Sequence, residues 1–124
     1  MAVDLNHTIV PCRDKLASAR FLAGLLDLEV QQEWGGFIPV QTANGVTLYY
    51  MEAEDFRPIH YCFLVGDEEF DAILARVAGR GLTYWADPGH RKEGEINHLF
   101  GGRGFYFDDP DGHNLEVITA PYSQ

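Results

Sequence analysis

The predicted order of secondary structure occurs twice in this chain, and this repeat restricts the possible folds more than any other feature. Each half begins with a short apolar strand that contains one histidine, followed by an amphipathic helix and then by further extended segments. The first half spans about residues 1–54 and the second about residues 55–124, with no linker-like composition between them. We therefore expect one α+β domain over residues 1–124, built from two tandem βαβββ modules.

The first half carries the boundary signals of such a module. A strand at residues 5–10 contains His7, and Asp14 is placed to cap the helix that follows. Asp27 is expected to end that helix in the left-handed conformation, which aspartate can adopt. Strands are then expected at residues 28–30, 37–41 and 46–52, with a hairpin turn at Asn44-Gly45 between the last two.

The second half repeats these signals in the same order. His60 stands near the start of a strand at residues 59–65, and Asp67 is placed to cap the next helix. The apolar residues of that helix recur at the spacing of one buried face: Phe70, Ile73, Leu74 and Val77. Strands are expected at residues 82–85, 105–108 and 114–120, with a long loop at 87–102 and an Asp-Pro-Asp-Gly turn at 109–112.

The composition excludes several classes of partner. The formal net charge is −10, whereas nucleic acids and anionic membrane surfaces require a basic face on the protein. No apolar run approaches the roughly 18 residues of a membrane-spanning helix, and the N-terminus lacks the pattern of a signal peptide. We therefore expect a cytoplasmic protein that binds a small molecule. Cys12 and Cys62 form no disulfide framework and are expected to be small buried hydrophobic residues.

Two stretches, residues 104–116 and residues 5–9 with the helix after them, stand out by their sequence. They resemble the vicinal oxygen chelate superfamily, which comprises glyoxalases, bleomycin-resistance proteins and extradiol dioxygenases. The more specific stretch is GFYFDDPDGHNLE at residues 104–116, which is similar to the family's last hairpin and its metal-binding glutamate. The other is LNHTI at residues 5–9 with the helix after it, which resembles the family's first strand and helix. The resemblance implies a cup between paired modules, one divalent cation bound by three strands, and a swapped homodimer in short members.

By this resemblance, the expected metal ligands are His7, His60 and Glu116, with the first-module histidine joining the other two from the partner chain. The two halves align so that the histidines match each other, while Tyr49 stands opposite Glu116. Two imidazoles and one carboxylate suit Fe²⁺, Mn²⁺, Ni²⁺ or Zn²⁺ and leave positions open for two adjacent substrate oxygens. A glutamate inside the apolar run at residues 115–118 also needs a partner, which a metal would provide.

Several residues near this set have two interpretations each. In family members a tyrosine at the position of Tyr106 faces the metal, so the resemblance makes it the candidate catalytic hydrogen-bond donor; the alternative is a core aromatic residue. His90 and His98 lie in the long loop, where a general base could enter the cup but a solvated histidine is the simpler expectation. Arg103 could bind a ligand anion or a surface carboxylate. His113 is expected to hydrogen-bond within the hairpin.

Two functions remain open from the sequence. The first is a metalloenzyme acting on a small molecule with vicinal oxygens, of the dioxygenase, isomerase/lyase or thiol-transferase type. The alternative is a bleomycin-resistance-like protein that sequesters an aromatic or cationic antibiotic without turnover. The acidic charge favours the alternative, as do aromatic residues near the expected cup: Trp34, Phe37, Tyr49, Tyr50, Tyr61 and Trp85. A regulatory or scaffold module is a third, weaker possibility. Residues 94–98 lack the serine-rich pattern of the fosfomycin thiol transferases, which counts against that activity.

Overall fold

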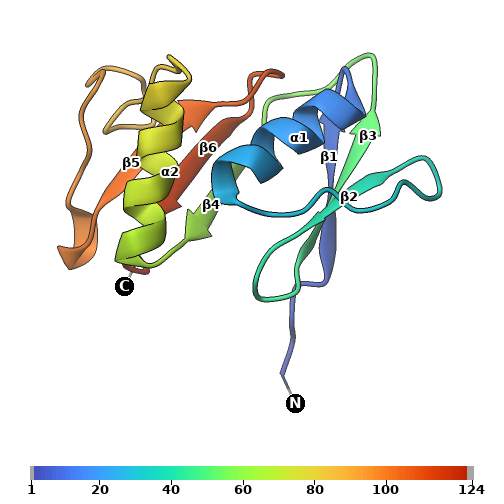
Figure 1. Ribbon diagram of the computed structural model, residues 1–124, viewed down its shortest axis with the longest axis horizontal. Coiled ribbons are helices and arrows are strands. Elements are labelled where there is room, and N and C mark those ends of the chain that lie inside the picture. Colours follow the sequence, from blue (N-terminus) through green and yellow to red (C-terminus); the bar gives the residue numbers. More distant parts are fainter. Residues whose placement is uncertain (1, 123–124) are drawn as a thin grey trace. The chain divides into compact units, whose positions relative to one another are not determined.

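The computed structural model describes residues 2–122 and separates into two compact units, Met1–Arg57 and Pro58–Gln124. Among the described residues, each unit contains one α-helix that lies against a three-stranded sheet (Figure 1). The two units therefore repeat one architecture, as the sequence predicted, and they match the tandem βαβββ fold. In residues 2–122 no helix is both long enough and apolar enough to cross a bilayer.

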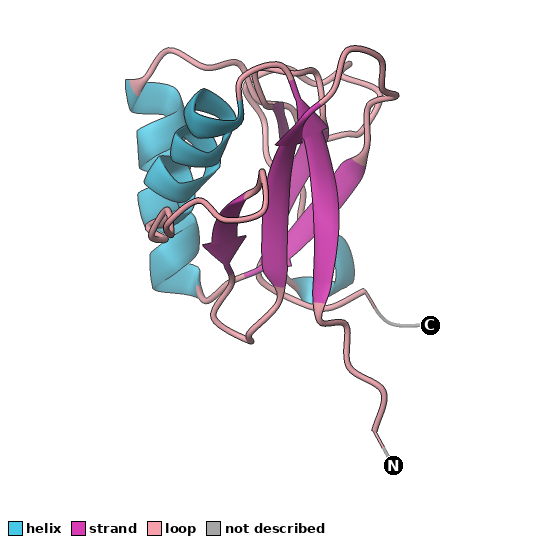
Figure 2. Ribbon diagram, turned by 90° about the vertical axis from the view of Figure 1, so that its right-hand side faces the viewer, coloured by secondary structure: helices cyan, strands magenta, loops and turns pink. Residues whose placement is uncertain are grey.

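The first unit consists of β1 (His7–Cys12), α1 (Lys15–Leu26), β2 (Ile38–Gln41) and β3 (Thr47–Glu52). Strand β3 is central; it runs parallel to β1 and antiparallel to β2. The amino-terminal segment leads directly into this sheet, whose strands lie side by side in Figure 2. The Asp14 carboxylate caps α1 by accepting a hydrogen bond from the Ala17 N–H at 3.1 Å. Asp27 ends the helix with φ of 57°, which confirms the predicted left-handed stop.

The second unit consists of β4 (His60–Leu64), α2 (Asp67–Gly79), a 3₁₀ turn (Leu99–Gly101), β5 (Gly104–Asp108) and β6 (Asn114–Ile118). Strand β6 is central, parallel to β4 and antiparallel to β5. The predicted apolar face of α2 is buried at Phe70, Ile73 and Val77. The Phe70 ring contacts the Phe105 ring of β5 at a centroid distance of 5.3 Å, so these side chains join the helix to the sheet.

The strand predicted directly after each helix is wrong in both units. Val30 forms only an isolated bridge with Val40, and Trp85 forms isolated bridges with Glu93 and Tyr106. Polar residues follow the first bridge, and an Asp-Pro-Gly stretch follows the second, so the pairing ends after a single residue. Each sheet therefore has three full strands, and a bridging segment takes the place of the fourth.

Two local predictions also need correction. Gly66, not Asp67, is the N-cap of α2, and the Glu69 side chain accepts the Gly66 N–H at 3.2 Å. Cys12 is buried as predicted, but Cys62 is exposed. The reason is that Cys62 lies on the face of its sheet that α2 does not cover, where every second residue of β4 is exposed.

One buried carboxylate holds the turn at residues 109–112. Asp109 is 7% exposed, and its Oδ1 accepts hydrogen bonds from the backbone N–H groups of Asp111 and His113, both at 2.9 Å. Gly112 adopts φ of 84°, which favours glycine. His113 bonds within the hairpin through its backbone N–H, as predicted, but its fully buried side chain reaches outside it, where Nδ1 accepts the Ile59 N–H at 3.0 Å. The turn is thereby tied to the residue that precedes β4.

The Asp109→Ala substitution should destabilise the protein, because it leaves two backbone donors without their acceptor. We expect a loss of about 2–4 kcal/mol in the free energy of unfolding, measured by urea denaturation. Asp109→Asn keeps an oxygen at the Oδ1 position and should lose about half of that or less. Equal stabilities of Asp109→Ala and the wild-type protein would contradict this account of the turn.

Candidate metal centre

The register of the second sheet aligns three side chains in a row. Cys62 pairs with Glu116, and Glu116 pairs with Tyr106. Successive side chains of a strand point to opposite faces, and Phe105 packs against α2, so the row lies on the opposite face. His60 precedes Cys62 by two residues and lies on the same face. We call this the site face of the second sheet.

His60 and Glu116 form the centre of the site face. His60 Nδ1 lies 2.8 Å from the carbonyl oxygen of Asn114, and a carbonyl oxygen can only accept, so Nδ1 carries the proton. In the neutral ring Nε2 then bears a lone pair, and it faces Glu116 Oε1 at 3.2 Å. Two acceptors at this distance repel each other unless a proton or a cation lies between them. A proton on Nε2 would make the two side chains an ion pair, and a cation between them would make them two ligands of a metal ion.

The burial of Glu116 raises the free-energy cost of leaving its negative charge without a partner. Glu116 is 1% exposed, and a carboxylate removed from water requires a positive charge or hydrogen-bond donors. The His60 side chain is 46% exposed, so the pair is reached from solvent through the histidine. A hydrogen bond from the far ring nitrogen to a backbone carbonyl is also the usual way of orienting a histidine that binds metal.

His7 has the corresponding position in the first unit. It pairs with Thr47 on the neighbouring parallel strand as His60 pairs with Asn114, and Tyr49 takes the position of Glu116. This register confirms the predicted alignment of the two halves. The His7 Nδ1 lies 2.7 Å from Oδ1 of the adjacent Asn6 side chain, so Nε2 is again the lone-pair nitrogen.

The second unit by itself brings together two of the three predicted ligands. Within residues 2–122, no group of three or more histidine, cysteine, aspartate or glutamate side chains is placed to hold a metal ion. The third predicted ligand, His7, lies in the other unit.

Three donors surround the Glu116 carboxylate. The Tyr122 hydroxyl donates a hydrogen bond to Oε2. Burial and the neighbouring carboxylate raise the pKa of Cys62 to about 12, even though the residue is exposed overall. Burial also raises the pKa of Tyr106, whose ring stacks on His60 at a centroid distance of 5.9 Å. At neutral pH these groups keep their protons and can act as hydrogen-bond donors to the carboxylate.

The sequence did not single out Cys62 or Tyr122 as site residues. The alternation of β4 could have placed Cys62, because it lies two residues after the predicted ligand His60. Tyr122 follows β6 and has no counterpart in the repeated pattern, so only the path of the chain brings it to Glu116.

Arg103 and His90, for which the sequence allowed two roles each, both contact neighbouring side chains. Arg103 pairs with Asp67 at 3.1 Å and Asp71 at 2.7 Å and lies over the Phe70 ring, so it binds surface carboxylates. His98 is exposed, as expected. His90 is not simply solvated, because its ring stacks on Trp85 at 3.7 Å and its Nε2 lies 3.4 Å from Asp108.

The aromatic residues predicted near a cup separate into different environments. Trp34, Phe37 and Tyr49 form a cluster in the first unit, with ring centroids 5.4–6.2 Å apart. His7 packs edge-on against Tyr49 at 5.3 Å, and Trp34 is 59% exposed. Tyr50, by contrast, is buried in the core, which corrects its placement near the cup. The accessible aromatic surface of this unit therefore lies beside its histidine.

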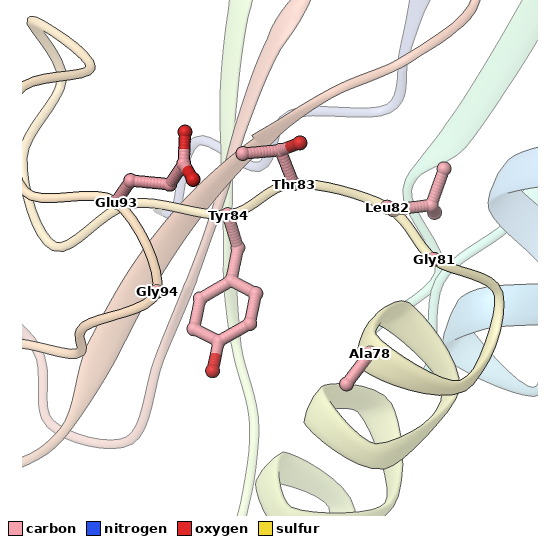
Figure 3. A pocket seen from close by; sticks show the side chains of 7 residues that line it. All are labelled: Ala78, Gly81, Leu82, Thr83, Tyr84, Glu93 and Gly94. Carbon is pink, nitrogen blue, oxygen red and sulfur yellow. The ribbon is translucent and has the colours of Figure 1, made fainter.

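A separate open hollow of about 300 Å³ lies at the carboxyl end of α2 (Figure 3). The Tyr84 and Glu93 side chains point in different directions from its rim. It contains none of the predicted ligands, and its lining is Ala78, Gly81, Leu82, Thr83, Tyr84, Glu93 and Gly94. One carboxylate and one phenol do not make a metal site, so we place no function there.

Solved structures with the same fold include close relatives of this chain. Oxidase ChaP-H2 is 58% identical, with a TM-score of 0.97 over 100% of this chain and 98% of the other. Oxidase ChaP-H1 is 56% identical, with a TM-score of 0.96 over 99% of this chain and 100% of the other.

Sequence comparison adds a curated transferase and a family model to these relatives. The chain is 32% identical to glutathione transferase FosA of Serratia marcescens over 94% of its own length and 81% of that protein. The model of the glyoxalase/bleomycin resistance protein/dioxygenase superfamily matches residues 4–117, which include all three predicted ligands and Tyr106. This chain belongs to the glyoxalase/bleomycin resistance protein/dioxygenase superfamily.

Proposed function

We propose that this chain is a metal-dependent enzyme of the oxidase type that acts on a small aromatic molecule with two adjacent oxygens. The metal would be Fe²⁺, Mn²⁺, Ni²⁺ or Zn²⁺, bound by His7, His60 and Glu116. Both units would act as one domain, and two chains would form a homodimer in which His7 joins the His60–Glu116 pair of the partner chain. Among the reaction types open to this superfamily, the oxidase type is favoured by the 58% identity to oxidase ChaP-H2.

One observation carries the metal assignment. His60 Nε2 and Glu116 Oε1 face each other at 3.2 Å as two acceptors, while Nδ1 of the same ring is committed to the carbonyl of Asn114. A divalent cation at this position would be bound by a lone pair from each and would balance the buried carboxylate. The competing occupant of this position is a proton on Nε2, because a doubly protonated ring would donate to both Asn114 and Glu116 without a metal. Metal binding by the protein separates the two.

The remaining residues of the site face would bind and orient the substrate. When bound, a divalent cation would supply Lewis acidity toward two adjacent substrate oxygens. The Tyr106 hydroxyl keeps its proton and lies in the same row as Glu116, so we assign it the donation of a hydrogen bond to a substrate oxygen. The net charge of −10 favours a neutral or cationic substrate over an anionic one.

The aromatic character of the substrate is proposed from the first unit. The 59% exposed Trp34 and its neighbours Phe37 and Tyr49 offer ring surface next to His7, where a planar ligand could stack.

Trp34→Ala should therefore weaken the binding of 2,3-dihydroxynaphthalene by about three- to tenfold in calorimetric titration. Tyr84→Phe, a change near the separate hollow, is the matched control. Unchanged binding in Trp34→Ala would contradict this assignment of the aromatic surface.

Metal binding is the first test of the proposal. Protein purified without chelators should contain a divalent metal or take up Zn²⁺ or Mn²⁺, as measured by elemental analysis and dye competition. His60→Ala should reduce the affinity on the order of 100-fold or more, because it removes a direct ligand. His98→Ala, which removes an exposed histidine from the loop, should bind as the wild-type protein does. A wild-type protein that takes up none of the four metals would overturn the proposed function.

A mixed dimer distinguishes a shared site from a site within one chain. His7→Ala and Glu116→Ala each remove one ligand, so each homodimer should bind metal on the order of 100-fold more weakly and stay empty at a metal concentration that fills the wild-type sites. If the ligands come from two chains, the heterodimer of these variants regains one complete site and half of the wild-type metal content. If the ligands come from one chain, the heterodimer stays empty. Differently tagged chains purified in two steps and examined by native mass spectrometry give the answer.

Sequestration without turnover is the second candidate, and the exposed aromatic surface beside His7 favours it specifically. The two candidates differ in what happens to a bound aromatic ligand. Tight binding of a polycyclic compound with unchanged ligand mass, in metal-loaded protein supplied with dioxygen, supports sequestration. Conversion of the ligand supports the enzyme.

A further inference from the structure

Tyr122 reaches the candidate metal centre from outside the region that the family model matches. That region ends at residue 117, yet the Tyr122 hydroxyl donates a hydrogen bond to Glu116. The general pattern of the superfamily therefore does not account for this contact.

The two oxygens of Glu116 have different partners. Oε1 faces His60 Nε2 at 3.2 Å, and Oε2 accepts the hydrogen bond from Tyr122. A carboxylate on a single side-chain bond can rotate, and a donor fixed on one oxygen determines where the other oxygen points. Tyr122 thus selects the orientation in which Oε1 and the histidine nitrogen converge.

The Tyr122 ring is itself held in place. It packs on the Phe100 ring at a centroid distance of 4.9 Å, and Phe100 belongs to the 3₁₀ turn. Phe100 adopts φ of 54°, an uncommon conformation for a residue with a bulky side chain. Both rings are about half exposed, at 44% and 51%, so burial alone does not explain why they meet here.

We propose that Tyr122 is a positioning residue for the metal ligand Glu116, and that Phe100 orients Tyr122 for this purpose. The inference rests on the proposed function, since it concerns the metal bound by His60 and Glu116. Tyr122 does not itself bind the metal or the substrate in this proposal. Its hydroxyl holds Oε2, so Oε1 already points towards His60 Nε2 before a metal binds. The Glu116 side chain then needs to reorient less on metal binding.

The test compares metal affinities of the full chain with Zn²⁺ and Co²⁺ as probes. Tyr122→Phe removes the hydroxyl but keeps the ring on Phe100, and it should weaken metal binding by roughly 10- to 100-fold. Phe100→Leu keeps the hydroxyl but loses the ring contact, and it should have a smaller effect. Tyr84→Phe removes one hydroxyl elsewhere in the second unit and should leave the affinity unchanged.

A spectroscopic readout separates positioning from a general loss of structure. The visible absorption of bound Co²⁺ depends on its donor set and geometry, so Tyr122→Phe should change that spectrum. The metal-free variant should stay folded, with a thermal midpoint only a few degrees below the wild-type value, because Cys62 and Tyr106 still flank the Glu116 carboxylate as donors.

The outcomes also separate this inference from the proposed function. If the wild-type protein takes up none of Fe²⁺, Mn²⁺, Ni²⁺ and Zn²⁺, the proposed function fails and takes this inference with it. If it binds one of them but not Zn²⁺ or Co²⁺, the affinities are compared with the metal that it binds. If the wild-type protein binds metal and Tyr122→Phe binds it equally well with an unchanged Co²⁺ spectrum, the positioning role alone is wrong. Tighter binding by Tyr122→Phe would also overturn it, because Tyr122 would then be a competitor of the metal.

Discussion

Glu116 lies on the central strand of the second sheet with 1% of its surface exposed, and the neighbouring side chains are arranged around its charge. His60 faces one of its oxygens and Tyr122 donates to the other, while Cys62 and Tyr106 flank it in the row. An isolated carboxylate at this depth would cost several kcal/mol, so these partners are a condition of the fold as well as features of a site. Structure and candidate chemistry therefore depend on the same interaction.

The two sheets share one architecture but differ at one position beside their histidines. Both units place a histidine on the first strand and a central parallel neighbour beside it, with the same register. On the central strand, the residue two positions after the one that pairs with the histidine is Tyr49 in the first unit and Glu116 in the second. The first unit consequently surrounds its histidine with aromatic rings, and the second surrounds its histidine with a carboxylate and donors. One architecture thus presents an apolar surface in one copy and a polar centre in the other.

Much of the fold could be predicted from the sequence, because its helix ends and turns depend on local signals. The left-handed stop at Asp27, the Asp-Pro-Asp-Gly turn and the helical apolar spacing are properties of short segments, and the structure confirms them. The alignment of the two histidines followed from the repeat. What the sequence missed depends on pairing across the chain: the bridging segments at Val30 and Trp85, the exposure of Cys62, and the approach of Tyr122 to Glu116. The bridging segments and the Tyr122 contact have no periodic or compositional signal, since a single bridge and a single contact leave none. The exposure of Cys62, by contrast, follows from the alternation of β4.

The turn after β5 shows why the local signals were nevertheless informative about the site. Asp109 fixes the turn, and the turn places His113 so that its Nδ1 accepts the Ile59 N–H at 3.0 Å. The Asn114 N–H in turn donates to the Ile59 carbonyl at 3.0 Å, and the Asn114 carbonyl accepts from the His60 ring at 2.8 Å. The start of β4 is thus fastened to the start of β6 by three hydrogen bonds. Since Glu116 lies two residues farther along β6, the turn sets the position of Glu116 relative to His60. The Asp-Pro-Asp-Gly-His motif therefore supports the candidate site without contributing one of its predicted ligands.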